Sequence, residues 1–297
     1  MNFQKVAVIG TGTLGTQIAI QAACFGYTIS AYDVDRESFL RSQAYLLSAI
    51  KRTGGKRLPS PEQWEKTAKQ IKRCDELAEA LVDADLVIEA VVEDLSVKRT
   101  VFQEIDALAP EKTIVATNSS SIPISRIENA TSRPDRCVNM HFYFPALGTN
   151  MVDVMGGTKT TTEVMEACKA WVRSIGCVPL TVKKESFGFC FNRIWHAVKR
   201  EALHLWAEGY VDFTDIDRAW MIFTGMKQGP FGIMDNVGLD VAYDIEMLYY
   251  HESNDPHDRP PDALAAMIEK KELGAKTGKG FYRYPHPEYR KPDFLAG

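Results

Sequence analysis

The sequence predicts an α/β protein in which an N-terminal, doubly wound and mainly parallel sheet precedes an all-α C-terminal domain. Over residues 1–185, short apolar runs rich in Val and Ile alternate with helical patterns, as in β-α-β units with helices on both faces of a sheet. A glycine-rich turn links the first strand to the first helix. Over residues 186–297 the apolar spacing is helical, which places a domain boundary near Lys184–Gly188.

The strands expected in the first domain are short apolar segments bounded by turn residues: Lys5–Gly10, Thr28–Asp33, Asp85–Val91, Lys112–Thr117, Cys137–Phe142, Met151–Met155 and Val178–Val182. Helices are expected over residues 13–25 and 36–52, and again between the third and fourth of these strands. A further helix begins after Ser60, because Ser60 can cap it, Pro61 suits the first turn and Gln63 completes a capping box.

The helices expected in the second domain cover Phe189–Glu208, Ile216–Phe223, Ile233–Tyr250 and Asp262–Lys271. Its only strand candidate is the short terminal run Gly280–Tyr284. The most loop-like stretch is Asn254–Pro261, because Pro and Asp disfavour regular structure there.

Composition excludes several classes of protein. The 297 residues are 45% apolar and 25% charged, with a net charge of −4, which is ordinary for a globular protein and argues against a general nucleic-acid binder. No apolar run approaches the ~18 residues of a membrane span, and the chain enters a strand pattern directly, so no signal peptide is expected. The six cysteines are scattered, which indicates thiols in a reducing cytoplasm and neither a disulfide framework nor a metal site.

The glycine-rich turn has the pattern G-x-G-x-x-G, and it follows an expected strand and opens an expected helix, the context that gives the pattern meaning. Gly10 allows the tight turn, Gly12 lets a pyrophosphate approach the backbone, and Gly15 lets helix and strand pack closely. Thr13 and Leu14 open the helix, whose N-terminus attracts phosphates. The turn predicts a Rossmann-type dinucleotide site; the alternative is a glycine turn that holds no ligand.

Asp33 ends the second strand, where a carboxylate can accept hydrogen bonds from an adenosine ribose. The same carboxylate repels a 2′-phosphate, so the sequence favours NAD over NADP as the cofactor. Arg36 is close enough in the chain to weaken that preference.

His141 is the best candidate for a catalytic base, because it ends a strand beyond the expected nucleotide crevice. Asp153 lies in the next strand candidate, and two strands joined by a turn would bring the two side chains together, which would fix the tautomer of the histidine. A hydrogen-bonded structural histidine is the alternative. The other histidines lie in helical or loop-like segments without an obvious acidic partner: His196, His204, His251, His257 and His286.

Several sequence blocks, in order along the chain, carry a family resemblance: GTGTLG at 10–15, DLVIEAVVED at 85–94, ATNSSSIPI at 116–124, MHFYFP at 140–145, GFCFNR at 188–193, GPFGIMDNVGLD at 229–240 and KTGKGFYRY at 276–284. On these blocks the sequence resembles the L-3-hydroxyacyl-CoA dehydrogenase family over essentially its whole length.

The resemblance implies roles for four catalytic residues. His141 would take the proton of the 3-hydroxyl group while hydride leaves C3 for the nicotinamide, and Asp153 would orient His141. Ser120 would hydrogen-bond the substrate oxygen, and Asn192 would reach the same pocket. Two plainer roles compete, since Ser120 could cap a helix and Asn192 could bridge the domains.

The resemblance also places Glu93 and Lys98 at family positions near the nicotinamide-side ribose, with Asn118 ending a strand beside them. The chain departs from the family at two positions. Asp153 stands where Glu is usual, so the carboxylate is one methylene shorter, and Phe144 stands where an H-F-x-N-P pattern has Asn. These departures imply either a reshaped dyad or a pocket built for a different acyl group.

Coenzyme A binding would suit a cluster of basic residues that includes Lys51 and Lys56, in the extension that covers CoA in the family. The full cluster is Lys51, Arg52, Lys56, Arg57, Lys66, Lys69, Lys72 and Arg73. An ordinary solvated helix face is the alternative.

The sequence therefore predicts a cytoplasmic, NAD-dependent dehydrogenase of a short-chain L-3-hydroxyacyl-CoA, dimeric through its helical domain, without membrane or nucleic-acid partners. An oxidoreductase of a non-CoA 3-hydroxy acid or dicarbonyl is the nearest alternative, and a catalytically idle NAD-binding or structural protein is the next. The sequence leaves open the acyl length, the need for CoA and the direction of the reaction.

Overall fold

The computed structural model describes residues 3–53, 60–143 and 151–297, and it divides into two compact units, Met1–Cys190 and Phe191–Gly297. The boundary predicted after residue 185 lies a few residues before this division. Phe144 and Lys56 fall outside the described residues, and so does the side chain of Lys51.

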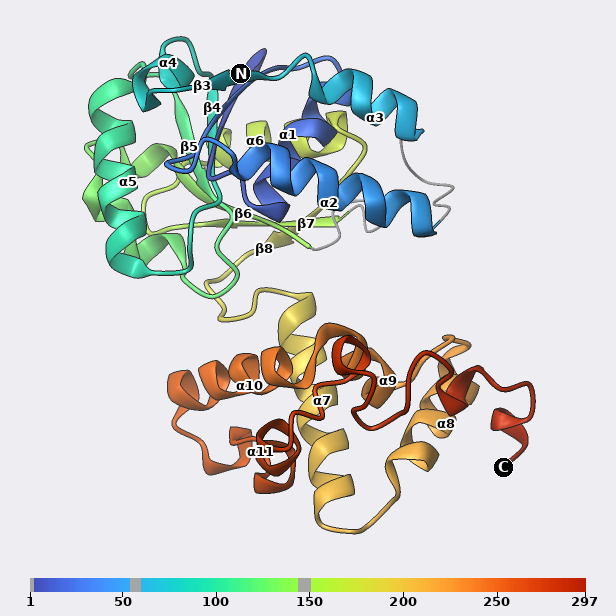
Figure 1. Ribbon diagram of the computed structural model, residues 1–297. Coiled ribbons are helices and arrows are strands. Elements are labelled where there is room, and N and C mark those ends of the chain that lie inside the picture. The colour runs from blue at the N-terminus through green and yellow to red at the C-terminus, as the bar shows by residue number, and fades with distance from the viewer. Residues whose placement is uncertain (1–2, 54–59, 144–150) are drawn as a thin grey trace. The chain divides into compact units, whose positions relative to one another are not determined.

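The first unit is built on one eight-stranded sheet in the order β3-β2-β1-β4-β5-β6-β7-β8. Figure 1 shows the strands of this sheet between their flanking helices. Neighbouring strands run parallel, except that β6 and β7 are antiparallel. The mainly parallel sheet is therefore confirmed. The strands are β1 (Lys5–Ile9), β2 (Thr28–Tyr32), β3 (Lys72–Cys74), β4 (Leu86–Glu89), β5 (Ile114–Thr117), β6 (Cys137–Phe142), β7 (Met151–Gly156) and β8 (Val178–Val182).

Helices cover both faces of this sheet, as the alternating pattern predicted (Figure 1). They are α1 (Thr13–Cys24), α2 (Ser38–Thr53), α3 (Pro61–Ala68), α4 (Leu77–Leu81), α5 (Leu95–Leu108) and α6 (Thr162–Ser174). Side chains of β1 alternate between the two faces: Val6 and Val8 join the apolar core with α1, α3 and α6, while Ala7 and Ile9 join the core with α4 and α5. This alternation is the period of two that a strand imposes.

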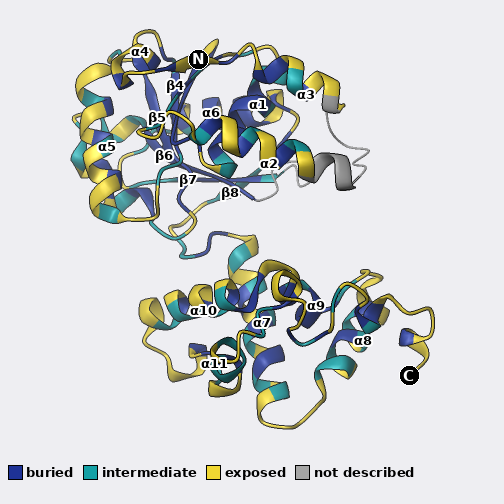
Figure 2. Cartoon of the chain, viewed as in Figure 1, coloured by how far each residue is buried: buried dark blue, intermediate teal, exposed yellow. Residues whose placement is uncertain are grey.

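The central strands β4, β5 and β6 are buried along their whole length (Figure 2). Burial on both faces explains why they appear in the sequence as continuous apolar runs and not as alternating ones. At α3, Ser60 Oγ accepts a hydrogen bond from the Gln63 backbone N–H at 3.2 Å, so the predicted N-cap is confirmed.

Two elements, β3 and α4, were not predicted from the sequence. Strand β3 consists of Lys72, Arg73 and Cys74 at the edge of the sheet, where charged side chains are common because they protect an exposed edge from further pairing. Its composition therefore lacks the apolar signal of the inner strands. Helix α4 spans only five residues, too few to show a helical period.

The second unit is helical around a core of its own. Its helices are α7 (Phe191–Ala207), α8 (Phe213–Thr224), α9 (Pro230–Val237), α10 (Leu239–Ser253) and α11 (Asp262–Glu269). The single helix predicted over Ile233–Tyr250 is wrong, because Gly238 adopts φ 106° and separates α9 from α10. The strand predicted at Gly280–Tyr284 is also wrong; the described chain there forms only isolated bridges at Lys279.

All six cysteines are free thiols, and four of them are buried. Burial raises the pKa of Cys137 and Cys168 to about 12, which makes these thiols poor nucleophiles. Within the described ranges, no helix is long and apolar enough to cross a membrane.

Candidate active site

The glycine-rich turn between β1 and α1 has the geometry of a nucleotide-binding loop. Gly10 has φ 93°, and a Cβ there would lie 2.5 Å from the Ala90 carbonyl oxygen. A Cβ on Gly15 would lie 1.9 Å from the Gly10 carbonyl oxygen. A Cβ on Gly12 would meet nothing within 4 Å, so the space above this residue is open to a ligand.

Helix α1 begins at Thr13, directly after Gly12, with no side-chain cap on its N-terminus. Uncapped N–H groups and the positive end of the helix dipole suit a pyrophosphate. The open space above Gly12 and this uncapped helix end therefore fit a dinucleotide, with Thr13 and Leu14 in the first turn.

Asp33 follows β2 and holds the glycine loop in place. Its Oδ2 accepts hydrogen bonds from the Thr11 backbone N–H at 2.6 Å and from Thr11 Oγ1 at 3.2 Å. The carboxylate retains further acceptor capacity for a ribose. Arg36 forms an exposed ion pair with Asp75, with Nε 3.5 Å from Oδ1.

Lys98 is buried in the first unit between two carboxylates. Its side chain is 1% exposed, and Nζ lies 2.8 Å from Glu89 Oε1 and 3.3 Å from Glu93 Oε2. Glu89, which the sequence analysis did not select, is fully buried and also accepts a hydrogen bond from Thr117 Oγ1 at 2.7 Å. The sequence did contain a signal for Glu89, because it is an acidic residue inside the apolar run at 85–91. A carboxylate buried in such a run requires a partner.

Glu93 organises the loop that carries Ser120. Its Oε1 accepts hydrogen bonds from the backbone N–H groups of Ser120 at 3.0 Å and Ser121 at 2.8 Å, and from the Ser119 hydroxyl. Burial by itself would raise the pKa of Glu93, but Lys98 and the serine hydrogen bonds outweigh it and lower that pKa. The exposed Ser120 hydroxyl makes no hydrogen bond to any described residue, so it is available to a ligand.

Asn118 directly follows β5 and connects this end of the strand to β6. Its Oδ1 accepts a hydrogen bond from the Phe142 backbone N–H at 2.8 Å. Asn118, the Ser119–Ser121 loop and His141 therefore lie at the carboxyl ends of β5 and β6, the edge where open α/β sheets bind ligands.

His141 and Asp153 are direct partners in the antiparallel pairing of β6 with β7. The distance from His141 Nδ1 to Asp153 Oδ2 is 3.4 Å, and both residues are buried. The strand register thus brings together the two side chains that were expected to meet across neighbouring strands. Asp153 thus contacts Nδ1, which leaves Nε2 of His141 for another partner.

His141 contacts two aromatic side chains that were not predicted to belong to the site. The Phe189 ring stacks on the imidazole with a centroid distance of 5.0 Å and an interplanar angle of 14°. The Tyr143 ring meets the imidazole edge-on at 4.5 Å, and its hydroxyl donates a hydrogen bond to Asp153 Oδ2. Asn192 lies in the first turn of α7, in the second unit, and its role at the site stays a prediction.

His196 corrects one expectation, because it has two acidic partners. Its Nδ1 lies 2.6 Å from Glu246 Oε2 and its Nε2 lies 3.2 Å from Asp258 Oδ1, within the helical unit. Lys199 pairs with Glu246 and Arg200 with Asp258, so the buried charges there neutralise one another. His204 likewise contacts Glu208, and His257 contacts Glu201. Only the first of these pairs could be recognised from the sequence, because residues 204 and 208 have helical spacing.

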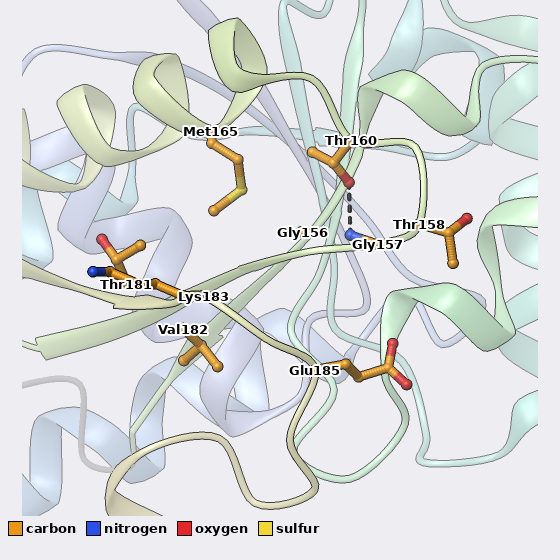
Figure 3. A pocket seen from close by; sticks show the side chains of 9 residues that line it. All are labelled: Gly156, Gly157, Thr158, Thr160, Met165, Thr181, Val182, Lys183 and Glu185. Atoms are coloured by element: carbon orange, nitrogen blue, oxygen red, sulfur yellow. Dashed lines mark hydrogen bonds between the residues drawn. The ribbon is translucent and has the colours of Figure 1, made fainter.

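A cavity of about 310 Å³ lies at the far end of β7 from Asp153 and is lined by residues that include Gly157, Thr160 and Lys183 (Figure 3). Gly156, which also lines it, pairs with Val138 near the start of β6, so the cavity is at the opposite end of that strand from His141. None of the predicted site residues lines it. Within the described residues, no group of three or more His, Cys, Asp or Glu could hold a metal ion.

Comparison with known proteins agrees with this geometry. Residues 5–186 match the NAD binding domain of 3-hydroxyacyl-CoA dehydrogenase, and residues 188–284 match its C-terminal domain. The mitochondrial hydroxyacyl-coenzyme A dehydrogenase of Rattus norvegicus is 33% identical over 287 residues, which cover 95% of this chain and 91% of that protein. The 3-hydroxybutyryl-CoA dehydrogenase of Clostridioides difficile is 34% identical over 284 residues, which cover 94% of this chain and 99% of that protein.

Among solved structures, a diketoreductase described as acting on dicarbonyl compounds has a TM-score of 0.85 and 36% identity, covering 96% of this chain and all of that one. The two domain matches span nearly the whole chain, and the glycine loop fits the nucleotide that the first domain of the family binds. The chain therefore belongs to the 3-hydroxyacyl-CoA dehydrogenase family and is an NAD-dependent oxidoreductase.

Proposed function

We propose that the protein oxidises a short-chain L-3-hydroxyacyl-CoA to the 3-oxoacyl-CoA, or catalyses the reverse reduction, with His141 and Asp153 as a catalytic dyad. The pairing of these two residues across β6 and β7, beside Asn118 and the Ser119–Ser121 loop, is the observation that carries the proposal. A histidine whose Nδ1 faces a carboxylate can act as a general base through Nε2.

In the oxidation, His141 Nε2 accepts the proton of the 3-hydroxyl group as the C3–H bond breaks and C3–O becomes a carbonyl. NAD⁺ supplies the hydride acceptor. Asp153 stabilises the imidazolium that results, and Ser120 and Asn192 hydrogen-bond the substrate oxygen. In the reverse direction the same imidazolium returns the proton to the oxygen.

A CoA-linked substrate is supported by exposed basic side chains at the end of α3 and in β3: Lys66, Lys69, Lys72 and Arg73. Phosphate groups of CoA would be attracted to them. The Clostridioides difficile relative is named for a four-carbon acyl group, which supports a short chain.

We also propose that the protein is located in the cytoplasm and that it forms a homodimer. The dimer would form through the helical unit. On α10, Val241, Ile245 and Leu248 share one face and are 42%, 37% and 49% exposed, an apolar stripe typical of a helix that packs against a partner. Ile245→Lys should shift the protein to a monomer in sedimentation velocity, while Asp244→Asn on the same helix should leave the dimer intact. A monomeric wild type would contradict the proposal.

A second candidate function is the oxidoreduction of a dicarbonyl or free 3-hydroxy acid. The diketoreductase likeness supports it, as does the change of the acyl pocket that Phe144 and Asp153 imply.

An NADH assay decides between the two candidate functions. It compares acyl-CoA esters, the matching free acids and small dicarbonyls as substrates. We expect 3-hydroxybutyryl-CoA to have a far higher kcat/KM than free 3-hydroxybutyrate. His141→Ala should lower kcat by ~10²–10⁴-fold, the loss typical of a missing general base, with NAD binding retained. A preference for free substrates favours the second candidate, and binding of NAD without turnover of any substrate favours a catalytically idle protein.

A further inference from the structure

Tyr143 and His141 share one carboxylate oxygen. The Tyr143 hydroxyl donates a hydrogen bond to Asp153 Oδ2, the same atom that faces His141 Nδ1. Tyr143 is 8% exposed and Asp153 is 0% exposed, so water competes little for this bond. Asp153 Oδ1 has no hydrogen-bond partner among the described residues. The orientation of the carboxylate therefore depends on the two partners of Oδ2.

The strand geometry explains why Tyr143 reaches this oxygen. Tyr143 directly follows β6, which ends at Phe142, and it is two positions after His141, the spacing at which side chains along a strand return to the same face of the sheet. Their rings are in edge-to-face contact at 4.5 Å. Both side chains therefore meet Asp153, which stands opposite His141 on β7.

The contact between His141 and Asp153 is long for a charge-assisted hydrogen bond. Nδ1 lies 3.4 Å from Oδ2, whereas such bonds are usually about 2.7–2.9 Å. A short Asp side chain without a further anchor could rotate away from the imidazole. A phenol that donates to Oδ2 prevents this rotation, and because it is neutral it leaves the negative charge available to the imidazolium.

We propose that Tyr143 is a positioning residue of the reaction, whose hydroxyl holds the Asp153 carboxylate against His141. This inference rests on the proposed role of His141 as the base. It also accounts for Asp at position 153. Asp with Tyr has the same number of side-chain heavy atoms as Glu with Phe, so the hydroxyl of Tyr143 occupies the space that one more methylene at position 153 would need.

The test is a double-mutant cycle of Tyr143→Phe, Asp153→Glu and the combined variant, assayed on the best substrate. Tyr143→Phe should lower kcat by about 10- to 100-fold, the range expected from the loss of a hydrogen bond to a charged group, with the KM for NAD unchanged. Asp153→Glu alone should also be slow, because the longer carboxylate is overpacked against the hydroxyl. The combined variant should recover to within about threefold of wild type, since the exchange conserves volume.

Tyr27→Phe is the matched control. It removes a hydroxyl hydrogen bond to Ser174 in the same unit, outside the site, and should leave kcat unchanged. A Tyr143→Phe variant with wild-type kcat, or a combined variant as slow as the product of the single effects, would overturn the inference.

Nuclear magnetic resonance of the histidine ring protons gives a measurement that does not depend on turnover. The Nδ1–H signal of His141 should shift in Tyr143→Phe and stay unchanged in Tyr27→Phe; no shift would contradict the inference. The two proposals fail separately. If His141→Ala keeps wild-type activity, the proposed base is wrong, whereas an inactive His141→Ala beside a fully active Tyr143→Phe refutes only the role of Tyr143.

Discussion

Lys98 and Glu89 form an ion pair with 2.8 Å between Nζ and Oε1, and their side chains are 1% and 0% exposed. A second carboxylate, that of Glu93, lies 3.3 Å from the same Nζ. One buried cation thus balances two acidic groups, and through Glu93 it supports the backbone N–H groups of the Ser119–Ser121 loop.

Replacing this lysine should destabilise the first unit strongly. Lys98→Met leaves two carboxylates without their cation, and breaking a buried ion pair costs about 3–5 kcal/mol. Lys98 lowers the pKa of Glu93, so the loss of stability should shrink as the pH falls and Glu93 takes up a proton. Urea unfolding at several pH values measures this effect.

Lys112→Met is the control for that experiment. Its partner Asp85 lies 2.7 Å away, but Lys112 is 69% exposed, and such pairs contribute about 1 kcal/mol or less. Equal destabilisation by the two substitutions would contradict the importance of the buried cluster.

Two glycines of the nucleotide loop should respond differently to the same substitution. Gly12→Ala should fold normally, because its Cβ meets nothing within 4 Å, but should weaken NAD binding by about 1.4 kcal/mol or more, a factor of about ten. Gly15→Ala should destabilise the protein by about 1–3 kcal/mol, since its Cβ would stand 1.9 Å from a backbone oxygen. Thermal unfolding and NAD titration by fluorescence distinguish the two; unaltered NAD affinity in Gly12→Ala would place the pyrophosphate elsewhere.

Much of the fold was predictable because its signals are local. The inner strands are apolar runs, and the turn at Gly10–Gly15 has both its glycine spacing and its strand-helix context in the sequence. The break at Gly238 was not predictable, because a single glycine in an apolar run is compatible with a continuous helix.

The site was predictable where strand register determines it, as for His141 and Asp153. The parts that were missed depend on contacts between side chains of different elements, which only the folded structure brings together. Glu89 on β4 meets Lys98 on α5, nine positions further along the chain. Phe189 reaches His141 from a segment 48 positions further along the chain. Tyr143 is adjacent in sequence, but its hydroxyl becomes informative only when the position of Asp153 is known.

The choice between NAD and NADP should depend on Asp33. Asp33→Ser removes the negative charge and the acceptor of the Thr11 N–H. NAD binding should therefore weaken, and the difference in affinity between NAD and NADP should become smaller. Asp75→Asn is the companion variant, because it releases Arg36 from its ion pair and should improve NADP binding modestly. Dissociation constants for both cofactors test this; a wild type that prefers NADP would show that Arg36 outweighs Asp33.

Salt dependence should reveal whether the basic side chains near α3 bind CoA. Changing Lys66, Lys69 and Lys72 to Gln together should raise KM for an acyl-CoA ester with little change in kcat, the signature of binding lost equally from ground and transition states. It should also flatten the rise of KM with salt, because exposed charges are screened. Lys270→Gln with Lys271→Gln, on the helical unit, is the control; an unchanged KM in the triple variant would make the cluster an ordinary solvated surface.

Asp217 should make the stability of the helical unit depend on pH. Its side chain is buried and accepts hydrogen bonds from the backbone N–H groups of Phe231 at 2.8 Å and Gly232 at 2.9 Å, and from the Tyr282 hydroxyl at 2.9 Å. Burial raises the pKa of Asp217 to about 6, although these hydrogen bonds oppose the shift. The folded protein therefore holds a proton on this group up to a higher pH than the unfolded chain does.

The sign follows from linkage. A raised pKa means that the contribution of Asp217 to stability is fully present below about pH 4 and is lost as the pH rises through about 6. A shift of about two units corresponds to roughly 3 kcal/mol at most. Asp217→Asn cannot titrate at this position. The difference in free energy of unfolding, variant minus wild type, should therefore increase as the pH rises across this window. Asp262→Asn, at a side chain that is 89% exposed, should follow wild type. Urea unfolding at about pH 4, 5, 6 and 7 measures the difference, and parallel curves for wild type and Asp217→Asn would show that the buried carboxylate is ionised throughout.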